Sequence, residues 1–169
     1  MKTFHDFMVE CSQLDESSLS RIKSKTDKGG VAILSGSRGD KSSKENKARA
    51  KQLDRDIKGK GLPGATKVQG RWDEKDRKTG ETKKVKERSH VVTSGKKGKR
   101  AFSDTLKKLS KKYDQDAVLI QKKKTATLSA TRKGGLGKDK KIKAGTFKPG
   151  RTSSQGDTQI KKKTFTYEK

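Results

Sequence analysis

Two short runs of consecutive apolar residues, Val31–Leu34 and Ala117–Ile120, are the strongest core-forming signals in this chain. Each is long enough for one buried strand and far too short for a membrane-spanning helix, which needs about 20 apolar residues. Only 25% of the 169 residues are hydrophobic, whereas 39% are charged. Burial of so few apolar side chains cannot offset the entropy of ordering the whole chain. We therefore expect one small domain that carries basic loops and tails.

Cysteine and histidine are nearly absent from the sequence. Cys11 is the single cysteine, and the two histidines are His5 and His90. One cysteine excludes an internal disulfide and a cysteine-cluster metal site, so we expect neither a metal nor a cofactor. The chain begins with one lysine followed by acidic residues, whereas a secretory signal begins with a basic segment before an apolar run.

The charge balance favours a polyanionic partner. Lys and Arg total 46 against 20 Asp and Glu, so the formal net charge is +26. Such an excess is typical of proteins that bind DNA, RNA or an acidic protein assembly, although a solvated basic surface has the same composition. Lysine-rich clusters suit non-specific phosphate contacts more than base readout. The candidate nucleic-acid-binding residues are Lys83, Lys84, Lys86, Lys96, Lys97, Lys99, Arg100, Lys122, Lys123, Lys124, Lys138, Lys140, Lys141, Lys143, Lys161, Lys162 and Lys163.

The beginning of the chain differs in character from the rest. Residues 1–20 hold four acidic residues and one lysine, so they are net acidic. One helical face, with the spacing i, i+3, i+4 and i+7, is formed by Phe4, Phe7, Met8 and Cys11. This pattern predicts a short amphipathic docking helix. We assign residues 1–10 to a leader and residues 11–30 to a linker.

Residues 31–121 have the pattern of a folded α+β unit. The expected strands are residues 31–34, 66–72, 85–93 and 117–120. The expected helices are residues 43–58 and a segment whose apolar stripe is Phe102, Leu106, Leu109 and Tyr113. The order predicts a small βαββαβ sandwich, in which two helices cover one face of a mixed or antiparallel sheet.

The remaining residues, 122–169, are rich in Lys, Gly, Thr and Ser. This composition predicts a flexible basic tail. Near its end, Thr164–Tyr167 alternates like a strand, so we expect a terminal edge strand at residues 163–167.

The segment Met1–Glu10 resembles the capsid-targeting leader of internal head proteins in T-even-type tailed phages and their cyanophage relatives. Such leaders open with Met-Lys-Thr and an aromatic residue, and end at a glutamate after which a prohead protease cuts. The residues around the implied cut are Met8, Val9, Glu10 and Cys11. The residues implied to dock into a scaffold groove are Phe4, Phe7 and Met8. The alternative is an ordinary helix that packs on the domain.

Residues 31–121 are also similar to a small bacterial and phage family known as domain of unknown function 3293. The family pattern has an Asn-centred helix with a downstream Leu, a Gly-rich turn, a Glu-x-Ser strand, and a helix that ends in Gln before an apolar strand. The matching positions are Asn46, Arg49, Leu53, Gly61–Gly64, Glu87, Ser89 and Gln115. This family has no assigned chemistry, so the resemblance implies no activity.

A set of polar residues could converge on one side of the expected sheet and form a polar pocket. The set is Asn46, Arg49, Glu87, Ser89 and Gln115. The structural alternative, which we favour, is that Asn46 and Gln115 bridge elements while Glu87 pairs with Arg49. Ser89 and His90 are consecutive on a strand and should point to opposite faces, which argues against a Ser–His pair. We therefore predict no catalytic residues and lean against an enzyme.

Together these patterns predict a phage internal head protein, a virion cargo that a cleavable leader targets to the prohead core. Its expected partners are packaged DNA and the phage scaffold, prohead protease or capsid interior, with no membrane and no small-molecule substrate. Its expected location is the virion interior, and the host cytoplasm if the protein is ejected. The alternatives are an intracellular basic protein that binds RNA or DNA without a virion role, a host-enzyme modulator, or an enzyme built on the βαββαβ unit.

Overall fold

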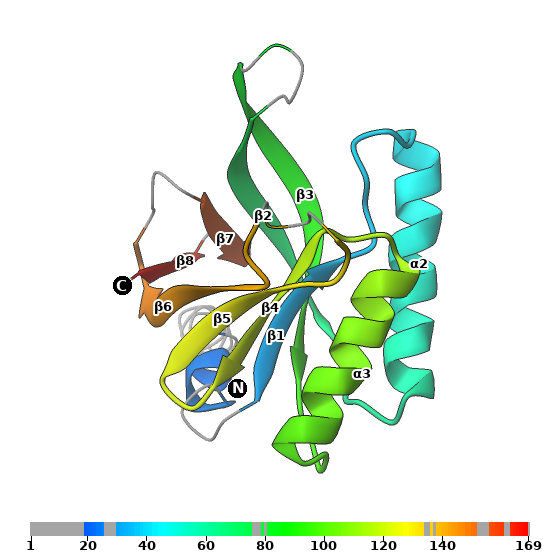
Figure 1. Cartoon of the computed structure of the whole chain (residues 1–169). Helices are drawn as coiled ribbons and strands as arrows, with labels where there is room; N and C mark the ends of the chain where they lie inside the picture. Colours follow the sequence, from blue (N-terminus) through cyan, green and yellow to red (C-terminus); the bar gives the residue numbers. More distant parts are fainter. Residues whose placement is uncertain are drawn as a thin grey trace, which may run out of the picture.

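A closed barrel of eight antiparallel strands, with two helices on its outside, makes up the described part of the chain (Figure 1). The computed structural model describes residues 19–25, 30–75, 79, 81–133, 136, 138–151, 156–160 and 163–168. The strands are β1 (Val31–Ser35), β2 (Thr66–Lys75), β3 (Thr82–Thr93), β4 (Ala117–Lys122), β5 (Thr125–Ala130), β6 (Lys141–Pro149), β7 (Gly156–Ile160) and β8 (Lys163–Glu168). The helices are α2 (Ser43–Gly59) and α3 (Lys99–Lys112), and a shorter helical segment spans residues 19–25.

The barrel closes through strand pairs that are distant in sequence. The order around the barrel is β1-β3-β2-β7-β8-β6-β5-β4, and β4 pairs with β1. The pairing of β2 with β7 is reinforced by Arg71, whose guanidinium donates to both carboxylate oxygens of Asp157 at 2.7 and 3.0 Å. The Asp157 side chain is 8% exposed, so this bidentate partner compensates its charge where water cannot.

The two helices pack over β1, β3 and β4 on one side of the barrel (Figure 1). Helix α2 begins with a capping box between Ser42 and Glu45, which satisfies two free backbone N–H groups. Its apolar residues recur every three or four positions and face the sheet. The helix–sheet core consists of Ala32, Leu34, Leu53, Ile57, Leu62, Val92, Phe102, Leu106, Leu109, Tyr113, Val118 and Ile120.

A second core fills part of the barrel lumen. Its buried residues are Ile22, Val31, Val68, Val91, Ile160 and Phe165. The rings of Phe147, Phe165 and Tyr167 form an aromatic cluster there, with centroids 5.0 to 6.4 Å apart. Ile22 comes from the segment 19–25, which lies near the start of β1 (Figure 1). Strand β1 is therefore apolar on both faces, because one face contacts the helices and the other faces the lumen.

The closed barrel shows that the predicted βαββαβ sandwich with a flexible tail was wrong. The six elements expected between residues 31 and 121 are present, but their strands form only half of the barrel. Strands β5 to β8 come from residues 125–168, and β8 coincides with the expected strand 163–167 but has neighbours on both sides. A barrel strand makes all its ladder hydrogen bonds and needs an apolar residue only at every second position. Threonine-rich segments can therefore fold although their overall hydropathy is low.

Candidate functional site

Three polar side chains on the lumen wall have a buried atom without a hydrogen bond among the described residues. The atoms are Ser89 Oγ, Gln121 Oε1 and Tyr167 OH. Ser89 pairs with Val68 of the lumen core, Gln121 is opposite Val31, and Tyr167 belongs to the aromatic cluster. Leaving a buried polar group unsatisfied costs about 1–3 kcal/mol. Such groups mark places where a ligand or an ordered water completes the hydrogen bonds.

The lumen wall next to these groups is only partly covered. Cross-strand neighbours on β1, β4, β5 and β6 form a continuous apolar row, made of Ile33, Leu119, Leu128 and Ile142. We call these four residues the lumen row. The first three are half-buried and Ile142 is 38% exposed, whereas Val91, the neighbour of Ile33 on β3, is 2% exposed. The tightly packed core therefore ends before β6. The apolar side chains near β6 are accessible, so a ligand can cover them.

A carboxylate lies on the same face of β3. Glu87 is two residues before Ser89, so strand alternation places both residues on the lumen side. Glu87 is half-buried and makes an interaction of its own. Its neighbour on β2 is Gly70, which has no side chain to cover it. The lumen thus holds a negative group within a protein whose net charge is +26.

The loop that follows β1 is held in place by helix α2. Arg49 donates from Nε to the Gly36 carbonyl at 2.6 Å and from a terminal nitrogen to the Tyr113 carbonyl at 2.7 Å. Asn46 both accepts from the backbone N–H of Arg38, at 2.8 Å, and donates to its carbonyl, at 2.9 Å. A Cβ at position 36 would lie 3.2 Å from the Arg49 carbonyl oxygen, so this close approach favours glycine. We call residues 36–42 the rim loop.

The rim loop is also tied to the lumen wall. Gln115 donates to the Ser37 carbonyl at 2.9 Å. Ser35, at the end of β1, accepts from the backbone N–H of Ser37 at 3.0 Å and donates to the Arg88 carbonyl at 2.8 Å. The loop is therefore preorganised by bonds from α2, from the α3–β4 turn and from β1.

The structure divides the polar set expected from the sequence into two groups. Asn46, Arg49 and Gln115 meet at the rim loop, where each bonds backbone groups. Glu87 and Ser89 lie on the lumen side of β3. The two groups are neighbours through Ser35, which pairs with Ser89.

His90 lies on the opposite face of β3 from Ser89, under helix α2. It is 1% exposed, and its Nε2 lies 3.2 Å from Asp54 Oδ1. This contact does not have the geometry of a hydrogen bond, because neither ring nitrogen of His90 has a hydrogen-bond partner among the described residues. Asp54 also pairs with Lys67 at 3.1 Å. Burial lowers the pKa of His90, the Asp54 carboxylate opposes that shift, and Lys67 adds to it, so the imidazole is neutral at pH 7.

We expect the free energy of unfolding to fall as the pH drops below about 6.5, because His90 then gains a proton in the unfolded chain before it does so in the folded protein. The stabilising contribution of neutral His90 is fully present above the pKa that the imidazole has in the unfolded chain. Below that pH, the free energy of unfolding falls with a slope that approaches about 1.4 kcal/mol per pH unit. Urea unfolding of the wild type and His90→Gln between pH 5 and pH 8 measures it. The variant should show the shallower slope, and parallel curves would contradict the assignment.

The structure describes only some of the other expected site residues. The leader residues Phe4, Phe7, Met8, Val9, Glu10 and Cys11 lie outside the described part of the chain. So do Lys161 and Lys162, while Lys83 and Lys84 are on β3. The remaining basic residues are spread over β3, the β3–α3 loop, α3, the end of β4, the β4–β5 turn, the β5–β6 loop, β6 and β8.

No helix in the described ranges is long and apolar enough to cross a membrane. The same ranges contain no group of three His, Cys, Asp or Glu side chains that could hold a metal ion.

Gln121 and Tyr167 were not predicted as site residues, because only the side of the strand on which each lies distinguishes them from other strand residues. Gln121 directly follows the apolar run Ala117–Ile120, and Tyr167 alternates with Phe165. Both patterns are visible in the sequence. Their meaning depends on which side of each strand faces the lumen, and that side is known only once the barrel is closed.

Comparison with known proteins places the chain in a family. The sequence model of the S-adenosylmethionine lyase family matches residues 32–169. A solved structure of a phage SAM lyase in complex with S-methyl-5′-thioadenosine is similar at 19% identity with a TM-score of 0.36, over 69% of this chain and 88% of that one. No match was found among curated proteins.

The family match overturns the functional expectations drawn from the sequence. It replaces both stated resemblances, the phage head leader and the domain of unknown function 3293, with a family named for an enzymatic activity. The head-cargo role, the DNA and capsid partners, the exclusion of a small-molecule substrate and the preference against an enzyme were wrong, because the family is named for the cleavage of a small molecule. The error arose because net charge reports on the surface, whereas an enzyme's chemistry depends on a few side chains in one site. This chain belongs to the S-adenosylmethionine lyase family.

Proposed function

We propose that this protein is an S-adenosylmethionine lyase that breaks the bond between the sulfonium sulfur and Cγ of the methionine moiety. The family match carries this proposal, because it extends from β1 to the end of the chain and so includes every strand of the barrel. S-methyl-5′-thioadenosine, the compound bound to the phage SAM lyase, is the thioether that this cleavage releases.

The proposed step needs no water. The electron pair of the Cγ–S bond moves to sulfur, which becomes a neutral thioether. Cγ of the four-carbon fragment forms its new bond within the fragment. Either its own carboxylate oxygen attacks Cγ and closes a lactone, or a Cβ proton leaves to a base and then to solvent while a Cβ–Cγ double bond forms. In both cases atoms and charges balance without an oxidant, a reductant or a second substrate.

The character of the lumen supports this chemistry. The sulfonium loses its positive charge as the bond breaks, so surroundings that solvate cations poorly favour the transition state over the bound substrate. The lumen row provides apolar walls of this kind beside the aromatic cluster. The unsatisfied hydroxyls of Ser89 and Tyr167 supply hydrogen bonds for a polar ligand. Burial raises the pKa of Tyr167, so its hydroxyl remains a donor at neutral pH.

We expect Glu87→Gln to raise the KM for S-adenosylmethionine about tenfold while kcat stays within about twofold, because the variant removes a countercharge for the substrate's ammonium group. Steady-state kinetics measure both constants. Glu81→Gln is the matched control, since Glu81 is an exposed carboxylate directly before β3. Equal KM values for the two variants would rule out a binding role for Glu87.

We expect Ser89→Ala to stabilise the free protein by about 1 kcal/mol and to weaken substrate binding, because its buried hydroxyl has no partner until a ligand arrives. Ser35→Ala is the control, since Ser35 is hydrogen-bonded at both its donor and its acceptor sites and its loss should destabilise by about 1 kcal/mol. Thermal unfolding and KM measure the two effects. A destabilised Ser89→Ala protein would show that this hydroxyl is already satisfied.

The activity itself is tested by incubating the full chain with S-adenosylmethionine in H2¹⁸O and analysing the products by mass spectrometry and NMR. A lyase forms S-methyl-5′-thioadenosine and a four-carbon product that carries no ¹⁸O when it is first released. Label incorporated during cleavage would indicate a hydrolase. Unchanged substrate would reject the proposal.

A further inference from the structure

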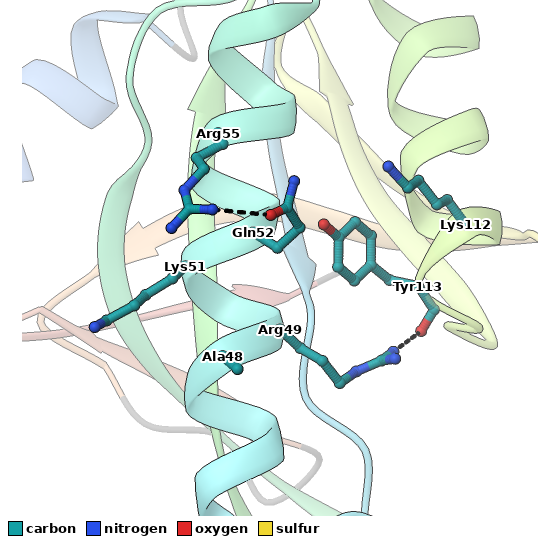
Figure 2. Close-up of a pocket in the computed structure, with 7 residues that line it drawn as sticks. All are labelled: Ala48, Arg49, Lys51, Gln52, Arg55, Lys112 and Tyr113. Atoms are coloured by element: carbon teal, nitrogen blue, oxygen red, sulfur yellow. Dashed lines mark hydrogen bonds between the residues drawn. The ribbon is translucent and has the colours of Figure 1, made fainter.

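A second hollow lies outside the barrel, between the exposed parts of helices α2 and α3 (Figure 2). Its volume is about 520 Å³, within the range of small-molecule sites. Its lining comes from about two turns of α2 and from the C-terminal end of α3. The lining residues are Ala48, Arg49, Lys51, Gln52, Arg55, Lys112 and Tyr113. It is separate from the lumen, because the helix–sheet core lies between them.

Positively charged side chains border this hollow, although its accessible wall is mainly apolar. Four of its seven residues are Arg or Lys. The adjacent carboxylate, Asp56, already accepts from Lys112 Nζ at 2.7 Å and from Tyr113 OH at 2.8 Å. The hydrogen bond from Lys112 holds the pKa of Asp56 below its usual value, so the carboxylate stays charged and neutralises that lysine. Arg49, Lys51 and Arg55 then remain around the hollow without a carboxylate partner among the described residues.

One of these cations is held in a defined position, and a second has a single hydrogen bond at the surface. Arg49 is fixed by its bonds to the Gly36 and Tyr113 carbonyls, which engage two of its three nitrogens and leave the third terminal nitrogen free to donate. Arg55 is exposed and donates to the Gln52 amide oxygen at 3.2 Å, and in Figure 2 Gln52 lies between Arg55 and the Tyr113 ring. A fixed guanidinium loses little entropy on binding and matches the geometry of a phosphate.

We propose that this hollow is a binding site for a phosphate-bearing small molecule with at least two negative charges, such as a diphosphate group. Three like charges around one hollow repel each other, and a multiply charged oxyanion relieves that repulsion while it accepts from Arg49 and Arg55. S-adenosylmethionine is not the ligand of this site, because its net charge is positive. The hollow therefore takes a different ligand from the proposed lyase site, although Arg49 both lines the hollow and holds the rim loop.

Isothermal titration of the full chain with pyrophosphate, at constant ionic strength set with chloride, tests the proposal. We expect one site per chain with a Kd of about 0.1–1 mM, and at least tenfold weaker binding by the double variant Lys51→Gln/Arg55→Gln. At tenfold excess over Kd, pyrophosphate should raise the Tm by about 3–6 °C. Arg49 is left unchanged because it also holds the rim loop.

The control is Lys44→Gln/Lys58→Gln, which removes the same charge from the exposed first and last turns of α2 outside the hollow. This control should bind pyrophosphate as the wild type does. Equal weakening in both double variants would show diffuse attraction to a basic protein and would overturn the proposal, as would the absence of saturable binding. Since no S-adenosylmethionine is present, neither result bears on the lyase activity.

Discussion

Raising the ionic strength from about 0.01 M to 0.2 M should lower the KM for S-adenosylmethionine roughly tenfold. Near neutral pH this substrate carries a sulfonium, an ammonium and a carboxylate, so its net charge is +1. The protein carries +26. For a folded chain of this length, with a radius of about 20 Å, the repulsion at the surface is about 3 kcal/mol at the lower salt concentration and about 1.5 kcal/mol at the higher.

The control for this experiment is a neutral ligand. S-methyl-5′-thioadenosine lacks the sulfonium charge, so its inhibition constant should change less than twofold over the same salt range. Initial rates at several substrate concentrations measure the KM, and competition measures the inhibition constant. A KM that rises with salt would contradict the expectation, because it would mean that the local field of the site is negative despite the net charge. A nucleic-acid contact, by comparison, weakens steeply with salt.

Arg49→Ala should reduce the free energy of unfolding by about 2–4 kcal/mol and kcat/KM by about tenfold. The variant removes two charge-assisted hydrogen bonds, to the Gly36 and Tyr113 carbonyls, and a cation–π contact with the Tyr113 ring at 5.5 Å. Both carbonyls lose a donor. The rim loop is tied through Ser37 to Ser35 on the lumen wall, so a loosened loop should also disturb the proposed site.

Arg49→Lys separates charge from geometry in this experiment. A lysine keeps the positive charge but cannot donate to two carbonyls in a planar fork, so we expect it to restore less than half of the lost stability. Urea unfolding and steady-state kinetics of the wild type and both variants measure the effects. Full recovery in Arg49→Lys would show that charge alone matters at this position. Unaltered kinetics in Arg49→Ala would remove the rim loop from the proposed site.

The elements between residues 31 and 121 were predictable because each has a strong local signal. The apolar runs of β1 and β4, the stripes of α2 and α3, and the alternation of β3 are patterns of neighbouring residues. The opposite directions of Ser89 and His90 follow from strand geometry in the same way, and the structure agrees. Asn46 and Gln115 hydrogen-bond backbone groups of the rim loop, whereas Arg49, which was expected to pair with Glu87, donates to two backbone carbonyls.

The second half of the barrel was not predictable by the same reasoning. Strand β5, for example, has the sequence TATLSA, which is too polar to indicate a buried strand by composition. What holds such strands is pairing with distant partners, as in β2 with β7 through Arg71 and Asp157. Pairings of this kind depend on chain closure over long separations, which local propensity does not encode.

By itself the sequence determined the charge of this protein, the positions of its helices and first four strands, and the faces on which their side chains lie. These properties follow from residue type and from periods of 2 and 3.6 residues. Only the tertiary structure decided that the strands close into a barrel and that Ser89, Gln121 and Tyr167 share its lumen. The physical reason is that a shared lumen is created by hydrogen-bond pairing between strands distant in sequence, and the side of each strand that faces it exists only after closure.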